Sequence, residues 1–373
     1  MRVAFVANSA WYLRNFRLST LQAFTGVHEV SVHYPEGGAV SAMNSLGLTQ
    51  HPFYLDSSGT HPLKELRGLL ALWRSLRRAR PEVVFSFNPK TNLYALMACW
   101  LMRVPCIPNV SGVGNASQLG GAKGRLYRTL AGFFYRRAAH VFFQNSDDCE
   151  AFLRAGWVRE GCYSLIPGSG VDLARFAPTL QTGAKPRPFR FLMAARLLAA
   201  KGVREYCAAS RALLAVHSGV ECWLAGGLAA ETRGVSEAEL DAWHATPGAD
   251  YLGHVDDMAS LLHEVDVVVL PSYYPEGIPR SLIEAAACGK LLITTTMPGC
   301  REVVVPGENG WQVPPRDEQA LLAAMSAAMT LSPQERAAMQ QASRELAERR
   351  FDEQIVIQQY QQVLAQQTSQ GVS

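Results

Sequence analysis

The sequence predicts an α/β protein made of two doubly wound parallel sheets. Three observations point to this fold class. The chain has 373 residues, which is too long for one ordinary core. Short apolar runs alternate with longer amphipathic segments, as in parallel α/β sheets. A stretch rich in Gly and Pro separates two such series. We therefore expect two Rossmann-like domains whose strand ends surround an interdomain cleft, where ligands of such sheets bind.

The first series of apolar runs precedes residue 170. Strands are expected at residues 3–7, 29–34, 83–87, 106–110 and 140–144. Helical patterns lie between several of them, at residues 62–79 and 92–102. Strands that alternate with helices of this length form a parallel sheet. Residues 1–172 are therefore the expected first domain.

The second series begins near residue 189. Its strands are expected at residues 189–194, 221–225, 250–252, 265–270 and 291–295, and its helices at 202–217, 257–263, 279–288 and 318–329. The composition of residues 173–187 is typical of a linker. Residues 173–351 are therefore the expected second domain. Residues 352–373 contain a late helix that could pack back on either domain, and we assign it to the first.

Charge is unevenly distributed along the chain. Residues 1–172 contain 18 Lys and Arg against 10 Asp and Glu, whereas residues 173–373 contain 17 against 22. A basic first half indicates an anionic partner, either an anionic membrane or a phosphorylated acceptor, although solvated helix faces account for the charges equally well. The contributing cations are Arg67, Arg74, Arg77, Arg78, Arg80, Lys123, Arg125, Arg128, Arg136 and Arg137.

Other classes of function find little support in the composition. The 8 cysteines are scattered without a Cys-x-x-Cys pair, which favours reduced thiols. No Asp-x-Asp pair occurs, so we expect no bound metal and no cofactor. The apolar runs are shorter than the roughly 20 residues of a spanning helix. We expect a cytoplasmic protein with no nucleic-acid partner, in peripheral contact with the inner face of the cytoplasmic membrane.

The loop after residues 189–194 reads ARLLAAKG and contains two cations. Arg196 and Lys201 stand at a strand end, and Gly202 opens the next helix. Cations beside free backbone N–H groups at a helix start suit a diphosphate, although an Arg and a Lys in a loop are more often simply solvated. Gly226 and Gly227 follow the next strand, where they permit close approach of a ligand or form a tight turn.

The stretch PEGIPRSLIEAAACGK at residues 275–290 contains two glutamates. Pro279 suits the first position of a helix, so Glu276 lies in the preceding loop and Glu284 in the second helical turn. A carboxylate there can accept hydrogen bonds from ribose hydroxyls, and the helix start can bind phosphate. A ligand with ribose, diphosphate and sugar would use both acids and both cations. Gly299 and Gly310 are expected to adopt unusual backbone angles.

These motifs resemble the C-terminal domain of the retaining nucleotide-sugar glycosyltransferases of family four. Glu276 and Glu284 fit the Glu-x7-Glu signature of that family, and Arg196 with Lys201 fits its Arg-x4-Lys-Gly loop. The resemblance covers residues 165–317 and implies a two-domain GT-B fold that transfers sugar with retention and without a metal.

The resemblance also implies roles for individual residues. Arg196 and Lys201 would neutralise the diphosphate leaving group. Glu276 would hold hydroxyls of the donor sugar, and Glu284 the ribose. Further donor contacts are implied for Gly226, Gly227, Gly277, Ile278 and Pro279.

The first domain departs from the family pattern. Ser111 stands where many members have a histidine, so the role of that histidine is not transferred to this chain. The loops at residues 8–17, 88–90 and 111–115 resemble a subgroup that builds O-antigen, capsule and other surface glycans on polyprenyl-diphosphate lipids. The acceptor-binding candidates are Arg14, Arg17, Lys90, Ser111 and Asn115.

The expected function follows from this resemblance. It is transfer of a hexose or N-acetylhexosamine from a nucleotide-diphosphate sugar, with UDP favoured, to a lipid-linked or saccharide acceptor in bacterial surface polysaccharide synthesis (O-antigen of lipopolysaccharide, capsule or exopolysaccharide). Two alternatives stay open. One is an isomerase resembling the nucleotide-sugar 2-epimerases, for which the first domain shows no acid/base pattern. The other is a non-catalytic nucleotide-sugar binder, which the missing histidine permits.

Overall fold

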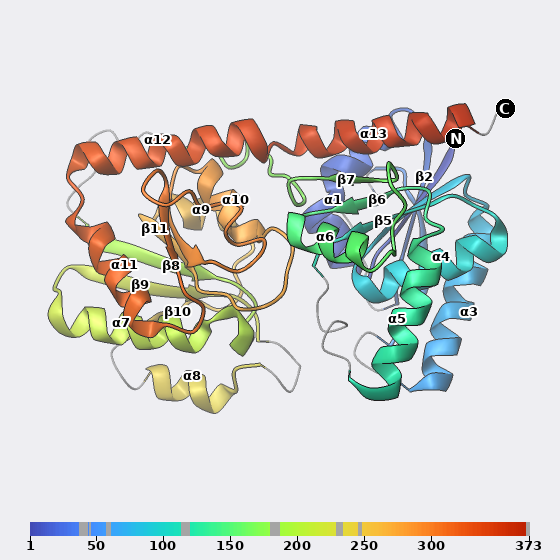
Figure 1. Ribbon diagram of the computed structural model, residues 1–373. Coiled ribbons are helices and arrows are strands. Elements are labelled where there is room, and N and C mark those ends of the chain that lie inside the picture. Colours follow the sequence, from blue (N-terminus) through green and yellow to red (C-terminus); the bar gives the residue numbers. More distant parts are fainter. Residues whose placement is uncertain are drawn as a thin grey trace. The chain divides into compact units, whose positions relative to one another are not determined.

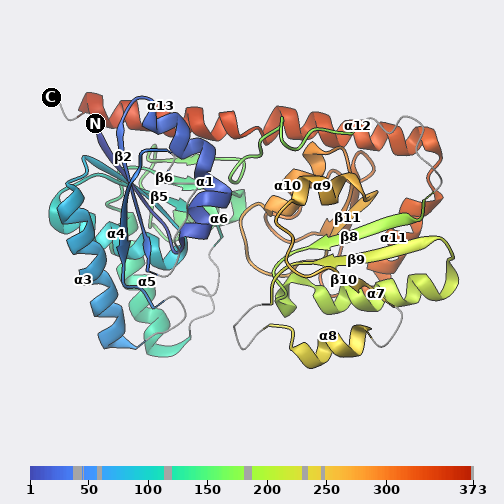
Figure 2. The same ribbon diagram turned by 180° about the vertical axis from the view of Figure 1, so that it is seen from behind.

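The computed structural model describes residues 1–36, 44, 46–56, 61–112, 120–179, 187–228, 234–244 and 248–370. The chain forms two compact units, one of Met1–Gly170 with Glu353–Ser373 and one of Val171–Asp352. Each unit is a parallel β-sheet with helices packed against it (Figures 1 and 2). The predicted α/β class with two doubly wound parallel sheets is therefore confirmed.

The first unit contains a seven-stranded sheet in the order β3-β2-β1-β4-β5-β6-β7. Its strands are β1 (Arg2–Val6), β2 (Glu29–Pro35), β3 (Thr49–Phe53), β4 (Val83–Phe87), β5 (Cys106–Val110), β6 (Val141–Phe143) and β7 (Tyr163–Leu165). Strands β4 and β5 are buried along their whole length, as expected for parallel strands covered on both faces. Because the strand order reverses between β1 and β4, the topological switch point of this sheet lies there.

The helices of the first unit cover the two faces of the sheet. They are α1 (Ala10–Thr25), α3 (Pro62–Ala79), α4 (Pro89–Met102), α5 (Gly121–Tyr135), α6 (Ser146–Arg154) and α13 (Glu353–Gln370). Helices α3, α4 and α5 pack beside one another, and α1 contacts α13. Val356 and Tyr360 of α13 belong to the same core cluster as Val3 and Phe5 of β1. A segment that follows the entire second unit thus completes the core of the first.

The second unit contains a six-stranded sheet in the order β10-β9-β8-β11-β12-β13. Its strands are β8 (Phe189–Ala194), β9 (Val220–Ala225), β10 (Asp250–Tyr251), β11 (Val267–Leu270), β12 (Leu291–Thr295) and β13 (Gly310–Val313). Its helices are η2 (Ala199–Lys201), α7 (Val203–Val216), α8 (Glu237–His244), α9 (Met258–His263), α10 (Arg280–Ala287), α11 (Glu318–Thr330) and α12 (Pro333–Arg350). Strands β8 and β11 pair directly, and the order reverses between them, so this is the second switch point.

The strands that the sequence did not predict have weak local patterns. Strand β3 reads TQHPF and contains a proline, which is unfavourable inside a sheet, and it lies at the edge where proline is tolerated. Strand β7 has three residues and none of them is fully buried. Strand β13 begins with a glycine. These strands are recruited by pairing with neighbours and not by an apolar run of their own.

Candidate active site

Predicted donor residues meet at the switch point of the second unit. Lys201 follows β8 and Glu276 follows β11, and these two strands are neighbours in the sheet. The ammonium of Lys201 forms an ion pair with Oε2 of Glu276, and the two side chains are only 12% and 14% exposed. Because parallel strands end at the same edge of a sheet, loops that are distant in sequence bring these opposite charges together.

Glu276 is held on its second oxygen as well. The hydroxyl of Ser272, which is fully buried, donates a hydrogen bond of 2.9 Å to Oε1 of Glu276. The backbone N–H of Tyr273 donates to the carbonyl of Ala200 at 2.9 Å, which ties the loop after β11 to the turn that carries Lys201. Sequence reasoning did not select Ser272 as a site residue. Its position as a polar residue two places after a buried strand was the available signal.

Two glycines allow the loop after β8 to pack this closely. Gly202 has a φ of +80°, and a Cβ at this position would lie 2.2 Å from the carbonyl oxygen of Pro271. Gly226 has a φ of +146°, and its Cβ would lie 1.8 Å from the carbonyl oxygen of Ala195. A Cβ on Gly227 would meet no atom of the described residues within 4 Å, so space remains beside this backbone.

Arg196 differs from Lys201 in its surroundings. Its side chain is exposed, and within the part of the chain that the structure describes no hydrogen bond or ion pair engages its guanidinium. Arg196 therefore presents a positive charge to solvent close to the Lys201 turn, since both belong to the same short loop.

Glu284 lies in the second turn of α10, as predicted, and is paired within that helix. The Nε–H of Arg280 donates to Oε1 of Glu284 at 2.6 Å, and the two side chains are 17% and 12% exposed. Burial raises the pKa of the Glu284 carboxyl, and the nearby guanidinium groups of Arg280 and Arg175 oppose that rise. Arg280 thus favours the ionised form of a carboxylate that burial disfavours.

The pair of Arg280 and Glu284 is not explained by the energetics of its own helix. Arg280 is the first residue of α10, where the helix dipole disfavours a cation. An arginine that precedes a glutamate by four residues is also in the less favourable order for such a pair. Sequence reasoning did not select Arg280. A cation at a helix start, one turn before a carboxylate, was the signal that could have identified it.

The backbone between the two glutamates is tightly packed. Gly277, Ile278 and Pro279 are buried. Pro279 is the N-cap of α10, with φ −66° and ψ 123°, so the helix begins at Arg280, one residue later than predicted. Gly299 has the expected unusual angle, with φ +80°, and its Cβ would lie 2.0 Å from the carbonyl oxygen of Gly277. For Gly310 the expectation was wrong, because this residue starts β13 without a positive φ. A glycine is required there for a different reason, since a Cβ would lie 1.9 Å from the carbonyl oxygen of Leu292.

The switch point of the first unit has a strained residue. Asn88 directly follows β4 and has a φ of +75°, a region that residues other than glycine rarely occupy. Its Oδ1 accepts a hydrogen bond of 3.3 Å from the backbone N–H of Asn8, which lies just beyond the end of β1. Strained residues at such positions are frequently functional.

The acceptor candidates occupy different environments in this unit. Residues 8–17 do not form the expected loop, because α1 begins at Ala10 with Ser9 as its N-cap, and Arg14 is exposed on this helix. Ser111 is half-buried after β5. Arg17 is only 1% exposed, and its guanidinium lies 4.6 Å from the ring centroid of Phe87 and 5.7 Å from that of Tyr360. The ammonium of Lys90 pairs with Oε1 of Glu65 at 2.7 Å. The remaining candidate, Asn115, lies outside the described residues.

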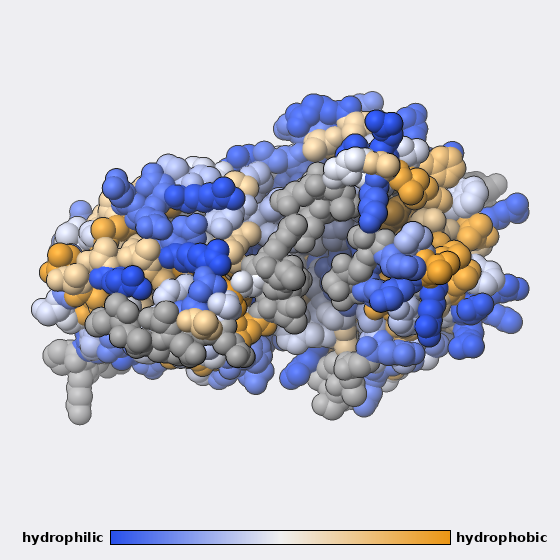
Figure 3. Space-filling model, turned by 90° about the horizontal axis from the view of Figure 1, so that it is seen from below, coloured by the Kyte–Doolittle hydropathy of each residue, from blue (hydrophilic) through white to orange (hydrophobic). Residues whose placement is uncertain are grey.

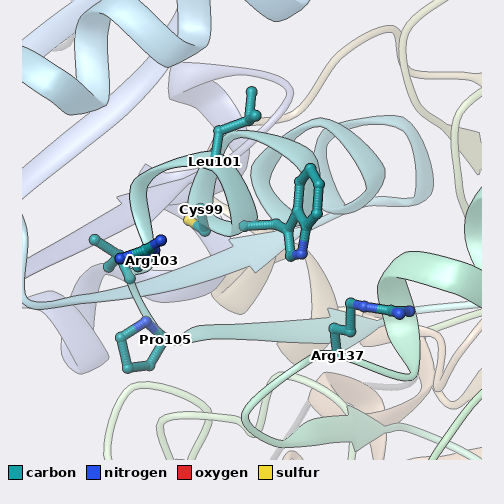
Figure 4. Close-up of a pocket in the computed structure, with 7 residues that line it drawn as sticks. Cys99, Leu101, Arg103, Pro105 and Arg137 are labelled. Carbon is teal, nitrogen blue, oxygen red and sulfur yellow. The ribbon is translucent and has the colours of Figure 1, made fainter.

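A pocket of about 600 Å³ lies elsewhere in the first unit (Figure 4). It is lined by Cys99, Trp100, Leu101, Arg103, Val104, Pro105 and Arg137, around the end of α4 and the start of β5. Because the acceptor candidates follow the carboxyl ends of strands, this pocket lies at the opposite edge of the sheet. None of the donor-binding or acceptor-binding candidates lines it.

The described residues contain no group of three or more His, Cys, Asp or Glu side chains arranged to hold a metal ion. None of their helices combines the length and apolar character needed to span a bilayer.

Two family models match the chain in separate segments. The model described as "Glycosyl transferase 4-like domain" matches residues 21–168, and the model described as "Glycosyl transferases group 1" matches residues 188–330. The second match contains Arg196, Lys201, Glu276 and Glu284.

Individual relatives agree with these models. The chain is 27% identical over 326 residues to the N,N'-diacetylbacillosaminyl-diphospho-undecaprenol alpha-1,3-N-acetylgalactosaminyltransferase of Campylobacter jejuni, covering 83% of this chain and 84% of that protein. It is 31% identical to glycogen synthase of Mycobacterium tuberculosis, covering 67% of this chain and 60% of that protein. The crystal structure of Anabaena HepE in complex with UDP and glucose has the same fold, with a TM-score of 0.80 at 19% identity, covering 98% of this chain and all of that one. The chain therefore belongs to the group 1 glycosyltransferases, the GT-B enzymes that its sequence motifs resemble.

Proposed function

We propose that this enzyme transfers a hexose or N-acetylhexosamine, with retention at the anomeric carbon, from a nucleotide-diphosphate sugar to a lipid-linked acceptor of bacterial surface polysaccharide synthesis. UDP is the favoured nucleotide. The observation that carries the proposal is the arrangement at the second switch point. There the pair of Lys201 and Glu276 and the exposed Arg196 lie at the edge of the sheet where nucleotides bind in doubly wound folds.

The charges at this site suit the chemistry of the leaving group. Departure of a nucleoside diphosphate builds negative charge, which fixed cations stabilise more in the transition state than in the ground state. We assign this role to Lys201 and Arg196, without a metal. Glu276 holds the Lys201 ammonium in place. With donor bound, a phosphate oxygen would take the ammonium, and the Glu276 carboxylate would accept hydrogen bonds from sugar hydroxyls.

The ribose end of the donor is assigned to α10. One carboxylate oxygen of Glu284 is fixed by Arg280, and the other has no hydrogen bond with the described residues. An oriented, ionised carboxylate can accept hydrogen bonds from both ribose hydroxyls. Gly226, Gly227, Gly277, Ile278 and Pro279 would supply backbone contacts to the rest of the donor.

The acceptor class rests on the relatives. The Campylobacter jejuni relative, whose match covers most of both chains, is named for an acceptor on undecaprenyl diphosphate. A lipid-linked diphosphate acceptor places this enzyme at the cytoplasmic face of the membrane, in peripheral contact with it. The glycogen synthase relative, which is matched over 60% of its length, supports a second candidate function in which the acceptor is a soluble saccharide.

One assay separates these possibilities. The pure protein is incubated with a panel of UDP-, GDP- and ADP-sugars, each with a polyprenyl-diphosphate glycan or with a soluble oligosaccharide, and nucleoside diphosphate release is measured. We expect release with one donor and the lipid-linked acceptor, unchanged by EDTA, and an α-linked product from an α-configured donor by NMR. Release with soluble saccharide alone would favour the second candidate. An isomerised nucleotide sugar would identify an epimerase, and binding without turnover a non-catalytic protein.

A further inference from the structure

We propose that the outer sides of α3 and α5 form an amphipathic surface that inserts apolar side chains into an anionic bilayer. This surface comprises Leu63, Leu66 and Leu70 of α3 and Leu126 and Phe133 of α5, with the cations that surround them. The inference deepens the proposed function and rests on it only for the location at a membrane. It goes beyond electrostatic attraction, because it requires leucine side chains in contact with lipid.

Helix α3 has apolar residues on two opposite sides. Its buried side is formed by Gly68, Leu72, Ser75 and Leu76. Leu63, Leu66 and Leu70 recur every three to four residues and lie on the side that faces away from the core. Leu63 is 72% exposed and Leu66 is 53% exposed. Core packing therefore accounts for one apolar side of α3 and leaves the other without a partner among the described residues.

Helix α5 repeats this arrangement. Its buried side includes Gly124, Ala131 and Phe134. Leu126 and Phe133, seven residues apart, lie on the opposite side, and Leu126 is 61% exposed. Of the exposed large hydrophobic side chains in the described residues, half belong to α3, α4 and α5. In Figure 3 hydrophobic residues lie among hydrophilic ones in both the left-hand and the right-hand part of the face shown.

The charges on these two helices are positive with one exception, and Lys64 of α3 also pairs with Asp56 of the preceding loop at 3.4 Å. Helix α3 carries Lys64, Arg67, Arg74, Arg77 and Arg78, and the amino-terminal half of α5 carries Lys123, Arg125 and Arg128. The single acidic residue of the two helices is Glu65, whose carboxylate accepts the Lys90 ammonium at 2.7 Å and a hydrogen bond of 2.5 Å from the Tyr94 hydroxyl. No carboxylate on either helix is thus left to repel an anionic surface.

An anionic bilayer fits this combination better than a purely electrostatic partner. Exposed leucine and aromatic residues interspersed with Lys and Arg are the features by which interfacial helices bind lipid. Each cation near an anionic leaflet strengthens binding by about fivefold. The ion pair of Lys90 and Glu65 ties the first turn of α4, which follows β4, to the first turn of α3. The surface therefore begins at the sheet edge that carries the acceptor candidates, where a lipid-linked substrate would arrive.

The test is co-sedimentation of the full-length protein with vesicles. Vesicles of phosphatidylcholine with 30% phosphatidylglycerol are compared with vesicles of phosphatidylcholine alone, at low and high salt. We expect strong binding to the anionic vesicles, partly lost at high salt. The variant L66E/L126E should weaken binding about tenfold and remove the salt-resistant part. The variant R67E/R128E should weaken binding by a similar factor and remove the salt-dependent part.

Matched control variants test whether the loss of vesicle binding is specific to this surface. Val216→Glu changes a 73% exposed apolar residue at the end of α7 in the second unit, and Arg349→Glu changes an exposed cation of α12. Both controls should bind vesicles like the unmodified protein. All variants should release nucleoside diphosphate normally with a short-chain, water-soluble acceptor. If the proposed function is wrong, the unmodified protein will release no nucleoside diphosphate in that assay. Its binding to vesicles does not depend on the proposed function, so the two failures can be distinguished.

Three results would overturn the proposal that this surface inserts into an anionic bilayer. The first is equal binding to anionic and neutral vesicles. The second is loss of binding in the Val216→Glu control as large as in L66E/L126E. The third is a dimer in light scattering that the L66E/L126E variant abolishes, because the apolar residues would then be covered by a second copy of the chain.

Discussion

The two units of this enzyme use their buried charges in different ways. In the second unit Lys201 pairs with Glu276 and Arg280 with Glu284, on the loops that follow adjacent strands and on helix α10. In the first unit the corresponding cations, Arg17 and Lys90, have separate partners. Arg17 lies against aromatic rings of β4 and α13, and Lys90 is tied to α3.

This difference indicates what each arrangement is for. Pairs of opposite charge at a switch point cost free energy through desolvation, which ligand binding can recover when the ligand replaces one partner. A guanidinium enclosed by rings is stabilised by cation–π attraction and contributes to packing. We therefore expect substitutions in the second unit to change donor affinity and rate, and substitutions at Arg17 or its neighbours to change stability.

The largest effect is expected for Lys201→Ala. This change removes a cation assigned to the leaving group, so the transfer rate should fall by about two to three orders of magnitude. Single-turnover kinetics with saturating donor would measure it. Arg211→Ala, an exposed cation on α7, serves as control and should react normally. A near-normal rate for Lys201→Ala would remove this residue from the mechanism.

The geometry of the same turn can be tested by Gly202→Ala. The new Cβ would lie 2.2 Å from the Pro271 carbonyl oxygen at a φ of +80°, so we expect a loss of about 3 kcal/mol in unfolding free energy. Gly219 has a similar φ of +77° with no atom within 4 Å of its Cβ position, so Gly219→Ala should cost about 1 kcal/mol. Calorimetry measures the unfolding free energy of both variants, and the difference between their losses is the steric contribution of the contact with Pro271. Equal losses would contradict such a contribution.

The positions of the site residues could be predicted from the sequence better in the second unit than in the first. Lys201 and Glu276 were predicted because each lies within a few residues of a strong apolar strand, and the carboxyl edge of a parallel sheet collects such loops. Glu284 was predicted because Pro279 marks the helix start to within one residue. Local spacing and the rule for strand order predicted where these residues lie, and the family resemblance supplied their roles.

The environment of Arg17 could not be predicted in this way. Its burial depends on Tyr360, which belongs to a helix that follows the whole second unit. A lone arginine on α1 has no local signal for that contact. Lys90 is similar, since its partner Glu65 lies on α3 and the pairing depends on how α3 and α4 pack. Long-range packing, and not local pattern, determines these positions.

The next effect in size is expected for Glu284→Ala. Loss of the proposed ribose contacts should weaken nucleotide binding about thirtyfold, as for removal of a charged hydrogen-bond acceptor. Isothermal titration with the nucleoside diphosphate would measure the change. Exposed Glu345 on α12 gives the control Glu345→Ala. If the affinity of Glu284→Ala matches that of the control, the ribose is held elsewhere.

A smaller effect with a distinctive pH dependence is expected for Arg280→Met. Burial raises the pKa of Glu284 and Arg280 opposes the rise, so donor affinity should fall as the pH drops and the carboxylate is protonated. Without Arg280 that pKa rises further, and the loss of affinity should begin at a higher pH. Arg175 faces the same carboxylate, and Cys288, the C-cap residue of α10, lies near it.

The measurement for Arg280 is donor affinity from pH 5 to pH 8. At high pH we expect about a fivefold weakening from the lost orientation of the carboxylate. Arg280→Lys should restore part of the affinity and most of the pH profile, because it retains the charge. A pH profile of Arg280→Met that coincides with that of the unmodified enzyme would show that Arg280 does not act through Glu284.

The smallest effect is expected in the first unit, for Tyr360→Phe. The Tyr360 hydroxyl accepts a hydrogen bond from Nδ2 of Asn109, and both residues are buried. Its removal leaves a buried donor without this partner and should lower the unfolding free energy by about 1 kcal/mol. The aromatic ring against Arg17 is retained, so donor affinity should not change. A fall in donor affinity at unchanged stability would break the division of roles between the two units, because Tyr360 belongs to the unit without donor residues.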